Sequence, residues 1–351
     1  TQTVTVEDTT APVITVPGNV TKEATGLQTI VAIGTATGTD AVGPVTITSN
    51  APATFGLGDT VVTWTATDAY NNFSTGTQTV TVEDTTPPVI TGPANVTEEA
   101  TGLQTIVAIG TATGTDAVGP VTITSDAPAT FGLGDTIVTW TATDAYNNSS
   151  TATQTVTVVD TTPPVITGPA NVTEEATGLQ TIVAIGTATG TDAVGPVTIT
   201  SNAPATFGLG DTVVTWTATD AYNNSSTATQ TVTVEDTTAP AFDLNQLATT
   251  VWPVNKRMVD AATVANVSDA VDANPSVVLT VTSNQSISSS DWNVAGNTVS
   301  VKADRSGKDG DRVYTVTATV TDFSGNSSSQ SVEVVVPHDQ GESKSGGKKK
   351  K

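Results

Sequence analysis

Carboxylates and a side-chain amide recur in this chain as sets of four, and oxygen atoms of these types are ligands for hard cations. The first set is Asp8, Asp40, Asp68 and Asn71. Ca²⁺ takes about six to eight oxygen ligands, and like charges gathered without a cation would repel one another. We therefore expect Ca²⁺ at each set. The other sets are Asp84, Asp116, Asp144 and Asn147; Asp160, Asp192, Asp220 and Asn223; and Asp236, Asp272, Asp322 and Asn326, with Asp269 as an alternative to Asp272.

Two other roles are open to acidic residues of this kind. Asp and Asn commonly cap turns by hydrogen-bonding their own backbone. Two carboxylates can also hydrolyse a glycosidic bond, but a cluster copied at every linker suits a joint better than an active site. We therefore expect no enzymatic activity. The chain has no Cys and one His, His338, so thiol, Ser-His and His-metal chemistry have almost nothing to work with.

The acidic sets follow an internal repeat of 76 residues. The stretch DTT(A/P)P begins at Asp8, Asp84, Asp160 and Asp236, so consecutive copies stand at a constant spacing. This spacing predicts three closely similar modules and a divergent fourth. Their predicted ranges are 8–83, 84–159, 160–235 and 236–337, and we call them modules 1 to 4.

Apolar residues alternate with Thr inside each module, which predicts short strands with one wet face. Val62, Trp64 and Ala66 would face a core, while the threonines between them face water. Turn residues separate the runs, so the fold class is all-β: tandem immunoglobulin-like antiparallel β-sandwiches forming an elongated rod. The strands predicted in module 1 cover about 13–16, 29–37, 45–49, 61–68 and 74–83.

This strand order brings each acidic set to the end of its module where the chain enters. Asp8 comes from the linker, Asp40 from the loop after strand 29–37, and Asp68 from the turn after strand 61–68. We expect Trp64, Trp140 and Trp216 to pack in the cores. Trp252 and Trp292 of module 4 are also expected to pack in a core, with ligand binding as the alternative.

The repeat resembles a known family in three stretches: DTTPPVITGPANVTEEATG, then TGTDAVGPVTITS, then VTWTATDAYNNSSTATQTVTV. These stretches look like the hyalin-repeat (HYR) module, over about Asp8 to Glu235. The resemblance implies an immunoglobulin-like domain of extracellular and cell-surface proteins. It also implies that a cysteine pair common in such modules would correspond to Val16 and Gly76, and its absence resembles prokaryotic surface proteins. Module 4 is similar in its later strands and departs from the pattern at its start.

The net charge limits the classes of molecule that this chain is expected to bind. The net charge is −22, and residues up to Asp236 carry 22 acids against a single base, Lys22. Nucleic-acid binding needs clustered Lys and Arg, so these totals argue against it. No apolar stretch is long enough to be a membrane span. The expected partners are cations, copies of the chain itself, neighbouring surface proteins, and a possible glycan or protein ligand.

The two ends of the sequence differ in composition. Residues 1–7 read TQTVTVE, identical to residues 77–83 and 229–235, which predicts the terminal strand of a missing preceding repeat. The alternative is a donor strand that completes the sheet of a neighbouring subunit. Residues 338–351 are predicted to form a disordered basic tail.

The sequence therefore predicts a non-enzymatic extracellular structural protein of the cell surface. We expect a calcium-binding rod in a surface layer (S-layer), a filament or the stalk of an adhesin, because near-identical modules suit spacing or stacking. The competing prediction is an adhesin whose divergent module 4 binds a glycan or protein ligand.

Overall fold

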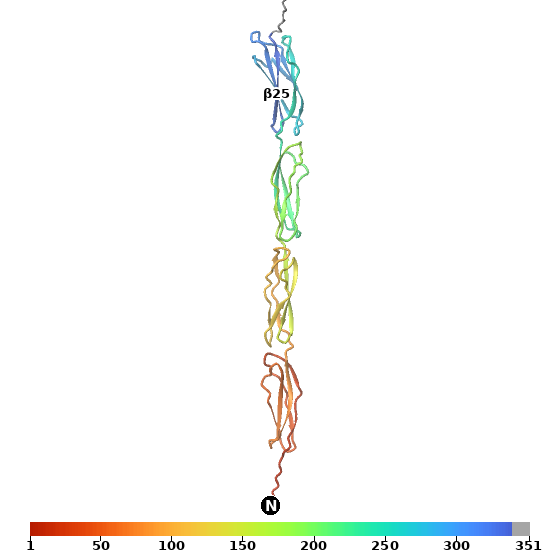
Figure 1. Ribbon diagram of the computed structural model, residues 1–351, viewed down its shortest axis with the longest axis vertical. Coiled ribbons are helices and arrows are strands. Elements are labelled where there is room, and N and C mark those ends of the chain that lie inside the picture. Colours follow the sequence, from red (N-terminus) through yellow and green to blue (C-terminus); the bar gives the residue numbers. More distant parts are fainter. Residues whose placement is uncertain (339–351) are drawn as a thin grey trace, which may run out of the picture. The chain divides into compact units, whose positions relative to one another are not determined.

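The computed structural model describes residues 1–338. They form two compact units. Unit 1 comprises residues 1–162 together with 193–195, and unit 2 comprises residues 163–192 together with 196 onward. Within residues 1–338 the 25 regular elements are all β-strands, and Figure 1 colours them along the chain. The tail from residue 339 lies outside the described residues, so the prediction for it stays a prediction.

Each of the first three modules has six strands at corresponding positions. Those of module 1 are β1 (Val13–Thr15), β2 (Val20–Glu23), β3 (Thr37–Thr39), β4 (Thr46–Ser49), β5 (Gly58–Thr67) and β6 (Phe73–Glu83). Those of module 2 are β7 (Val89–Thr91), β8 (Val96–Glu99), β9 (Thr113–Thr115), β10 (Thr122–Ser125), β11 (Gly134–Thr143) and β12 (Ser149–Val159). Those of module 3 are β13 (Val165–Thr167), β14 (Val172–Glu175), β15 (Thr189–Thr191), β16 (Thr198–Ser201), β17 (Gly210–Thr219) and β18 (Ser225–Glu235).

Two sheets face each other in a module. In module 1 the larger sheet has the order β2-β6-β5-β4, and the smaller one pairs β1 with β3. The first strand region thus changes sheet at Pro17-Gly18, because β1 pairs antiparallel with β3 and β2 pairs parallel with β6. The predicted strand 29–37 is mostly irregular: Thr29 bridges Phe55, and regular pairing begins only at Thr37.

The core of each repeat lies between the two sheets and follows the predicted alternation. Val62 and Ala66 are fully buried, and Trp64, Trp140 and Trp216 are buried as expected. The Trp64 indole N–H donates to Gln78 Oε1 at 3.1 Å, and Gln78 Nε2 donates to the carbonyls of Gly18 and Ile33. The buried polar groups are therefore paired with one another, and this pairing ties three chain segments together.

The two positions that the family resemblance matched to cysteines face each other. A Cβ placed on Gly76 would lie 2.5 Å from Val16 Cγ1, so a large and a small residue share the space. In module 2 the sizes are exchanged, because Gly92 stands opposite Ala152 at 3.3 Å. Complementary packing occupies the place where a disulfide would otherwise lie.

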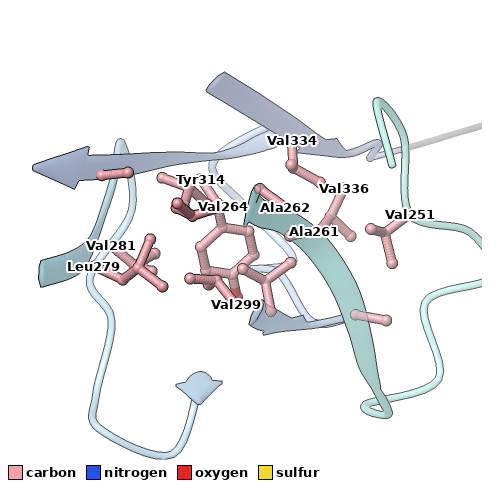
Figure 2. Close-up of a cluster of buried hydrophobic side chains, with 14 of the residues drawn as sticks. Val251, Ala261, Ala262, Val264, Leu279, Val281, Val299, Tyr314, Val334 and Val336 are labelled. Carbon is pink, nitrogen blue, oxygen red and sulfur yellow. The ribbon is translucent and has the colours of Figure 1, made fainter. Parts of the chain in front are cut away.

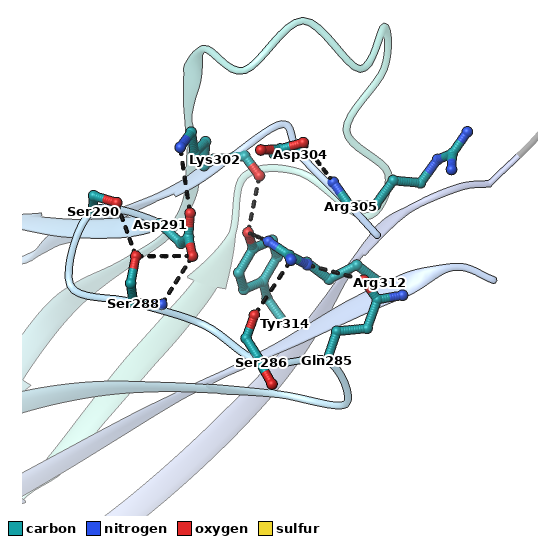
Figure 3. Close-up of polar contacts among 10 residues, drawn as sticks. All are labelled: Gln285, Ser286, Ser288, Ser290, Asp291, Lys302, Asp304, Arg305, Arg312 and Tyr314. Atoms are coloured by element: carbon teal, nitrogen blue, oxygen red, sulfur yellow. Dashed lines mark hydrogen bonds and ion pairs between the residues drawn. The ribbon is translucent and has the colours of Figure 1, made fainter. Parts of the chain in front are cut away.

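Module 4 has seven strands around a larger core (Figure 2). Its largest fully buried side chain is Tyr314, whose hydroxyl donates to the Lys302 carbonyl and accepts from Arg312 (Figure 3). Trp292 packs against the core as expected, but Trp252 is 49% exposed, so the expectation of core packing was wrong for it. The strands are β19 (Ala241–Gln246), β20 (Met258–Ser268), β21 (Ser276–Ser283), β22 (Trp292–Ala295), β23 (Thr298–Lys302), β24 (Arg312–Thr321) and β25 (Ser327–Val336).

Candidate cation sites at the module joints

Strand register carries the acids of a module to one end of its sandwich. Val13 at the start of β1 pairs with Thr39 at the end of β3, so the linker lies beside the loop that begins at Asp40. Thr67 pairs with Phe73, which closes the β5–β6 hairpin over the turn that begins at Asp68. The acids that sequence topology predicted to converge therefore do converge in the first set.

Three carboxylates meet in each set that lies within one unit. In unit 1 these are Asp8, Asp40 and Asp68, and then Asp84, Asp116 and Asp144, each offering an oxygen within 4.8 Å of the others. Asp84 and Asp144 are both buried. At this separation the three negative charges repel strongly unless a cation or protons neutralise them.

Asp84 holds an oxygen that lacks a partner. Its Oδ1 accepts from the Thr86 amide at 3.3 Å, while Oδ2 is buried without a hydrogen bond. Burial raises the pKa of this carboxyl, and the nearby charges of Asp116 and Asp144 add to the increase. Oδ2 of Asp8 is likewise buried and unpaired. An orphaned buried carboxylate oxygen is costly on its own, and cation coordination removes that cost.

Both carboxylate oxygens of Asp144, in contrast, accept hydrogen bonds from the turn that this residue begins. Oδ1 accepts from the amides of Tyr146 and Asn148 at 2.8 and 2.9 Å, and Oδ2 accepts from Asn148 Nδ2 at 2.9 Å. Burial raises the pKa of Asp144, but these hydrogen bonds outweigh it and the pKa is lowered. Turn capping, the other role expected for these residues, thus operates at the same acids. A carboxylate that accepts such bonds keeps lone pairs for a cation.

The asparagines differ from the predicted ligand role. Asn71 and Asn147 are exposed residues at the tips of their turns with φ of 70°, a left-handed conformation that Asn tolerates. The next residue contacts the cluster: Asn148 Nδ2 also donates to the Asp84 carbonyl at 3.0 Å. In module 4, Asn326 corresponds to Asn148 and donates to the Asp236 carbonyl and to Asp322 Oδ2. These amides hold the acids by donating, so in this structure they present nitrogen to the cluster.

Module 4 contains its own cluster within unit 2, formed by Asp236, Asp269 and Asp322. Asp269, the alternative candidate, takes the place proposed for Asp272. Asp272 Oδ2 accepts from the Phe323 amide at 3.0 Å instead. The signal for Asp269 was present in the sequence, because Asp-Ala-Val recurs at Asp40, Asp116, Asp192 and Asp269.

The third set is divided between the two units. Asp160 belongs to unit 1, whereas Asp192 and Asp220 belong to unit 2. Asp220 accepts from the amides of Tyr222 and Asn224, as its equivalents do, and Asn223 has a positive φ like Asn147. The convergence of this set with Asp160 remains a prediction from the repeat.

The ion pair found within residues 1–338 joins Lys302 to Asp291 in module 4, and it involves none of the acids of the three sets that lie within one unit. Carboxylate oxygens match a hard cation such as Ca²⁺ better than metals that prefer thiolate or imidazole, and the clusters contain neither of these ligands.

Sequence reasoning did not predict the roles of three residues beside the clusters. Val118 follows Asp116 and is 4% exposed, because it packs into the core of module 1 with Phe55 and Val82. Val271 packs in the same way into the core of module 3. Glu23, at the end of β2, contacts the linker that follows Asp84. Only the repeat of Asp-Ala-Val and of Glu before Ala-Thr-Gly hinted at these roles.

Residues 1–338 contain no helix with the length and apolarity needed to cross a membrane.

A family model and two relatives of known name all match this chain to the same family. The HYR domain matches residues 7–82, 83–158 and 159–234, which together exceed half of the chain. Hyalin of Lytechinus variegatus is 34% identical over 270 residues, covering 70% of this chain and 51% of the relative. Hyalin of Strongylocentrotus purpuratus is 34% identical over 258 residues, covering 66% and 22%. Both are sea urchin proteins, so they do not support the expected prokaryotic source.

Solved structures that resemble the chain have low sequence identity. The protocadherin GammaB4 extracellular domain is 15% identical, covers 93% of this chain and 66% of its own, and has a TM-score of 0.42. Protocadherin gammaB7 EC3-6 is 14% identical, with coverages of 93% and 100% and a TM-score of 0.41.

Proposed function

This chain belongs to the HYR domain family, and on that premise we propose that it is a non-enzymatic extracellular structural protein. Its immunoglobulin-like modules are linked into a rod whose joints bind Ca²⁺. The observation that carries this proposal is the cluster of Asp84, Asp116 and Asp144, in which Asp84 Oδ2 is buried without a hydrogen bond. Membership of the HYR domain family supports a role outside the cell, because modules of this type are common in extracellular and cell-surface proteins.

Calcium would act on the angle between modules more than on their folds. The cluster joins a linker residue, Asp84, to a loop and a turn of the following module. A cation held by all three restricts the linker, and its removal restores charge repulsion at the joint. With a dissociation constant of ~10⁻⁴ M and ~10⁻² M calcium, each site adds about 2.7 kcal/mol to the folded joint.

Calorimetric titration of the full chain with CaCl₂ tests the proposal. The wild type should bind Ca²⁺, and Asp84→Asn should lose one site. Asp135→Asn is the matched control, because Asp135 lies in the same module but bonds only Thr157 on the exposed sheet face. Small-angle scattering should give a longer mean end-to-end distance with Ca²⁺ than with a chelator. No binding by the wild type at millimolar calcium would refute the proposal.

A specific observation favours an adhesive role as a second candidate. Trp252 is half exposed in the segment that precedes β20, and this segment has no counterpart in modules 1 to 3. Exposed Trp supplies a flat apolar surface on which sugars and protein side chains pack. A glycan array probed with the wild type and Trp252→Ala tests this role. Equal binding by the two proteins, or none by either, would leave only the structural role for this module.

A further inference from the structure

A glutamate at the end of module 1 holds the linker to module 2. Glu23 Oε1 accepts from the Thr85 amide at 2.9 Å and from the Thr86 hydroxyl at 2.7 Å, while Oε2 accepts from the Thr85 hydroxyl at 2.7 Å. One carboxylate therefore holds both threonines that follow Asp84. We call Glu23 and this threonine pair the linker clamp.

The same clamp occurs at later linkers. Glu99 accepts from the Thr161 amide and from the hydroxyls of Thr161 and Thr162, all within 2.8 Å. In unit 2, Glu175 accepts from the Thr237 amide at 2.9 Å and from the Thr237 and Thr238 hydroxyls at 2.7 Å. The contact is thus a property of the repeat and is kept where module 4 diverges.

The clamp holds the two residues that directly follow the linker aspartate. Module 2 fixes the Asp84 carbonyl through Asn148, and the clamp fixes the two residues that follow. The Thr86 amide then donates to Asp84 Oδ1, which leaves Oδ2 buried and without a hydrogen bond in a residue that lies within the cluster. Asp84 is therefore held on both sides without any cation.

We propose that Glu23, Glu99 and Glu175 are positioning residues, which orient the linker aspartate for cation binding through the two threonines of the clamp. The inference rests on the calcium function proposed above. Pre-orientation lowers the entropy lost on binding, because the ligand oxygen already points at the site. Replacement of groups that hold metal ligands in place typically weakens metal affinity by about 10–100-fold.

Charge alone would give a competing explanation for any loss caused by Glu23→Gln, because a negative charge near the site also attracts cations. Thr85→Val with Thr86→Val removes the hydroxyl donors of the clamp while Glu23 keeps its charge. Both threonines are exposed, so these changes leave the core intact. Glu83→Gln is the matched control for charge, since Glu83 pairs with Glu23 across β2 and β6 and precedes Asp84. Module 2 has Val159 at the corresponding place.

Hydrogen exchange of the full chain, read by mass spectrometry on the peptide 74–90, reports this joint. That peptide differs from both counterparts at Gly76, and also from the module 2 counterpart at Glu83 and from the module 3 counterpart at Pro87, so it can be assigned. Glu23→Gln and the double Thr→Val variant should each raise the calcium concentration for half-maximal protection by about tenfold. Glu83→Gln and the double Thr→Ser variant, which keeps the hydroxyls, should stay within about twofold of the wild type.

The metal-free measurement separates this inference from the calcium function. With a chelator present, peptide 74–90 should exchange faster in Glu23→Gln and in the Thr→Val variant than in the wild type. An unchanged calcium midpoint in the Thr→Val variant would overturn the positioning role, whatever Glu23→Gln does. Absence of calcium-dependent protection in the wild type, with the metal-free difference retained, would refute calcium binding and leave the clamp as a linker contact only.

Discussion

Modules 1 and 2 contain the same strands and nearly the same sequence, yet the same residue has a different environment in each. Val42 and Val118 both follow Asp-Ala in the same loop. Val42 is 52% exposed and Val118 is 4% exposed, because Val118 lies in the core of module 1. The loop at the entry of module 2 is therefore completed by contacts with module 1. A module of this repeat is therefore both a folded domain and half of a joint.

The linker aspartates of the two modules also differ in burial, and again the residue of module 2 is the more buried one. Asp84 is buried and the threonines after it are clamped by Glu23, whereas Asp8 is only half-buried. Within residues 1–338 no glutamate bonds Thr9 or Thr10; the Thr10 amide donates to Asp8 itself. We infer from this contrast that the preceding module buries the linker aspartate and holds it in position. Three experiments test this contrast between modules 1 and 2.

The largest effect is expected from the two valines. Val118→Ala should destabilise the packing of module 1 against module 2 by about 2 kcal/mol, because a fully buried Val contributes about 1.5–3 kcal/mol. Val42→Ala, at an exposed site, should stay within about 0.5 kcal/mol. Hydrogen exchange of a module 1 peptide that contains Val82 measures the difference. Equal effects of the two substitutions would contradict the idea that the preceding module completes the loop.

A smaller effect should follow from exchanging the size of a core pair. Gly76→Ala places a Cβ 2.5 Å from Val16 Cγ1 and should cost about 1 kcal/mol through overpacking. Adding Val16→Gly should restore stability, because module 2 already carries Gly92 opposite Ala152. Urea unfolding of the single and double variants tests this compensation. Additive losses in the double variant would show that the pair is not one packing unit.

The smallest expected effect is the loss of the clamp at low pH. Hydrogen bonds from Thr86 and Thr85 lower the pKa of Glu23 from 4.5 to about 2. Because the folded-state pKa is lowered, the contribution of the clamp is complete above pH 4.5 and is lost as the pH falls toward 2. In calcium-free buffer, NMR of the side-chain carboxyl carbon should give a Glu23 pKa that moves back toward 4.5 in the double Thr85→Val, Thr86→Val variant. A pKa that the double variant leaves near 2 would mean that other groups hold the carboxylate.

Sequence reasoning succeeded where a local pattern decides the structure. Alternation placed Val62 and Trp64 in the core, and the positions of linker, loop and turn brought Asp84, Asp116 and Asp144 together. It failed at the asparagine beside the cluster. Asn147 was the predicted residue, but Asn148 makes the contact. The two residues carry the same side chain, and only the geometry of the turn selects between them.

Other features depend on contacts that no local pattern encodes. Val42 and Val118 stand in identical tripeptides, so their different burial follows only from the neighbouring module. Trp252 was expected in the core because of its size, yet the segment before β20 leaves it half exposed. The irregular backbone at 29–36 replaces most of a predicted strand, although its buried positions still include Val31 and Ala36.

The parallel pairing of β2 with β6 has a mechanical consequence. β2 lies near the start of module 1 and β6 at its end, and Val20 to Glu23 pair in register with Val80 to Glu83. Tension applied through the two linkers pulls these strands in opposite directions along their length. Their hydrogen bonds are then loaded in shear, so they must break together, and the unfolding rate under force depends on the whole patch. The module thus resists stretching at the strand pair that carries Glu23.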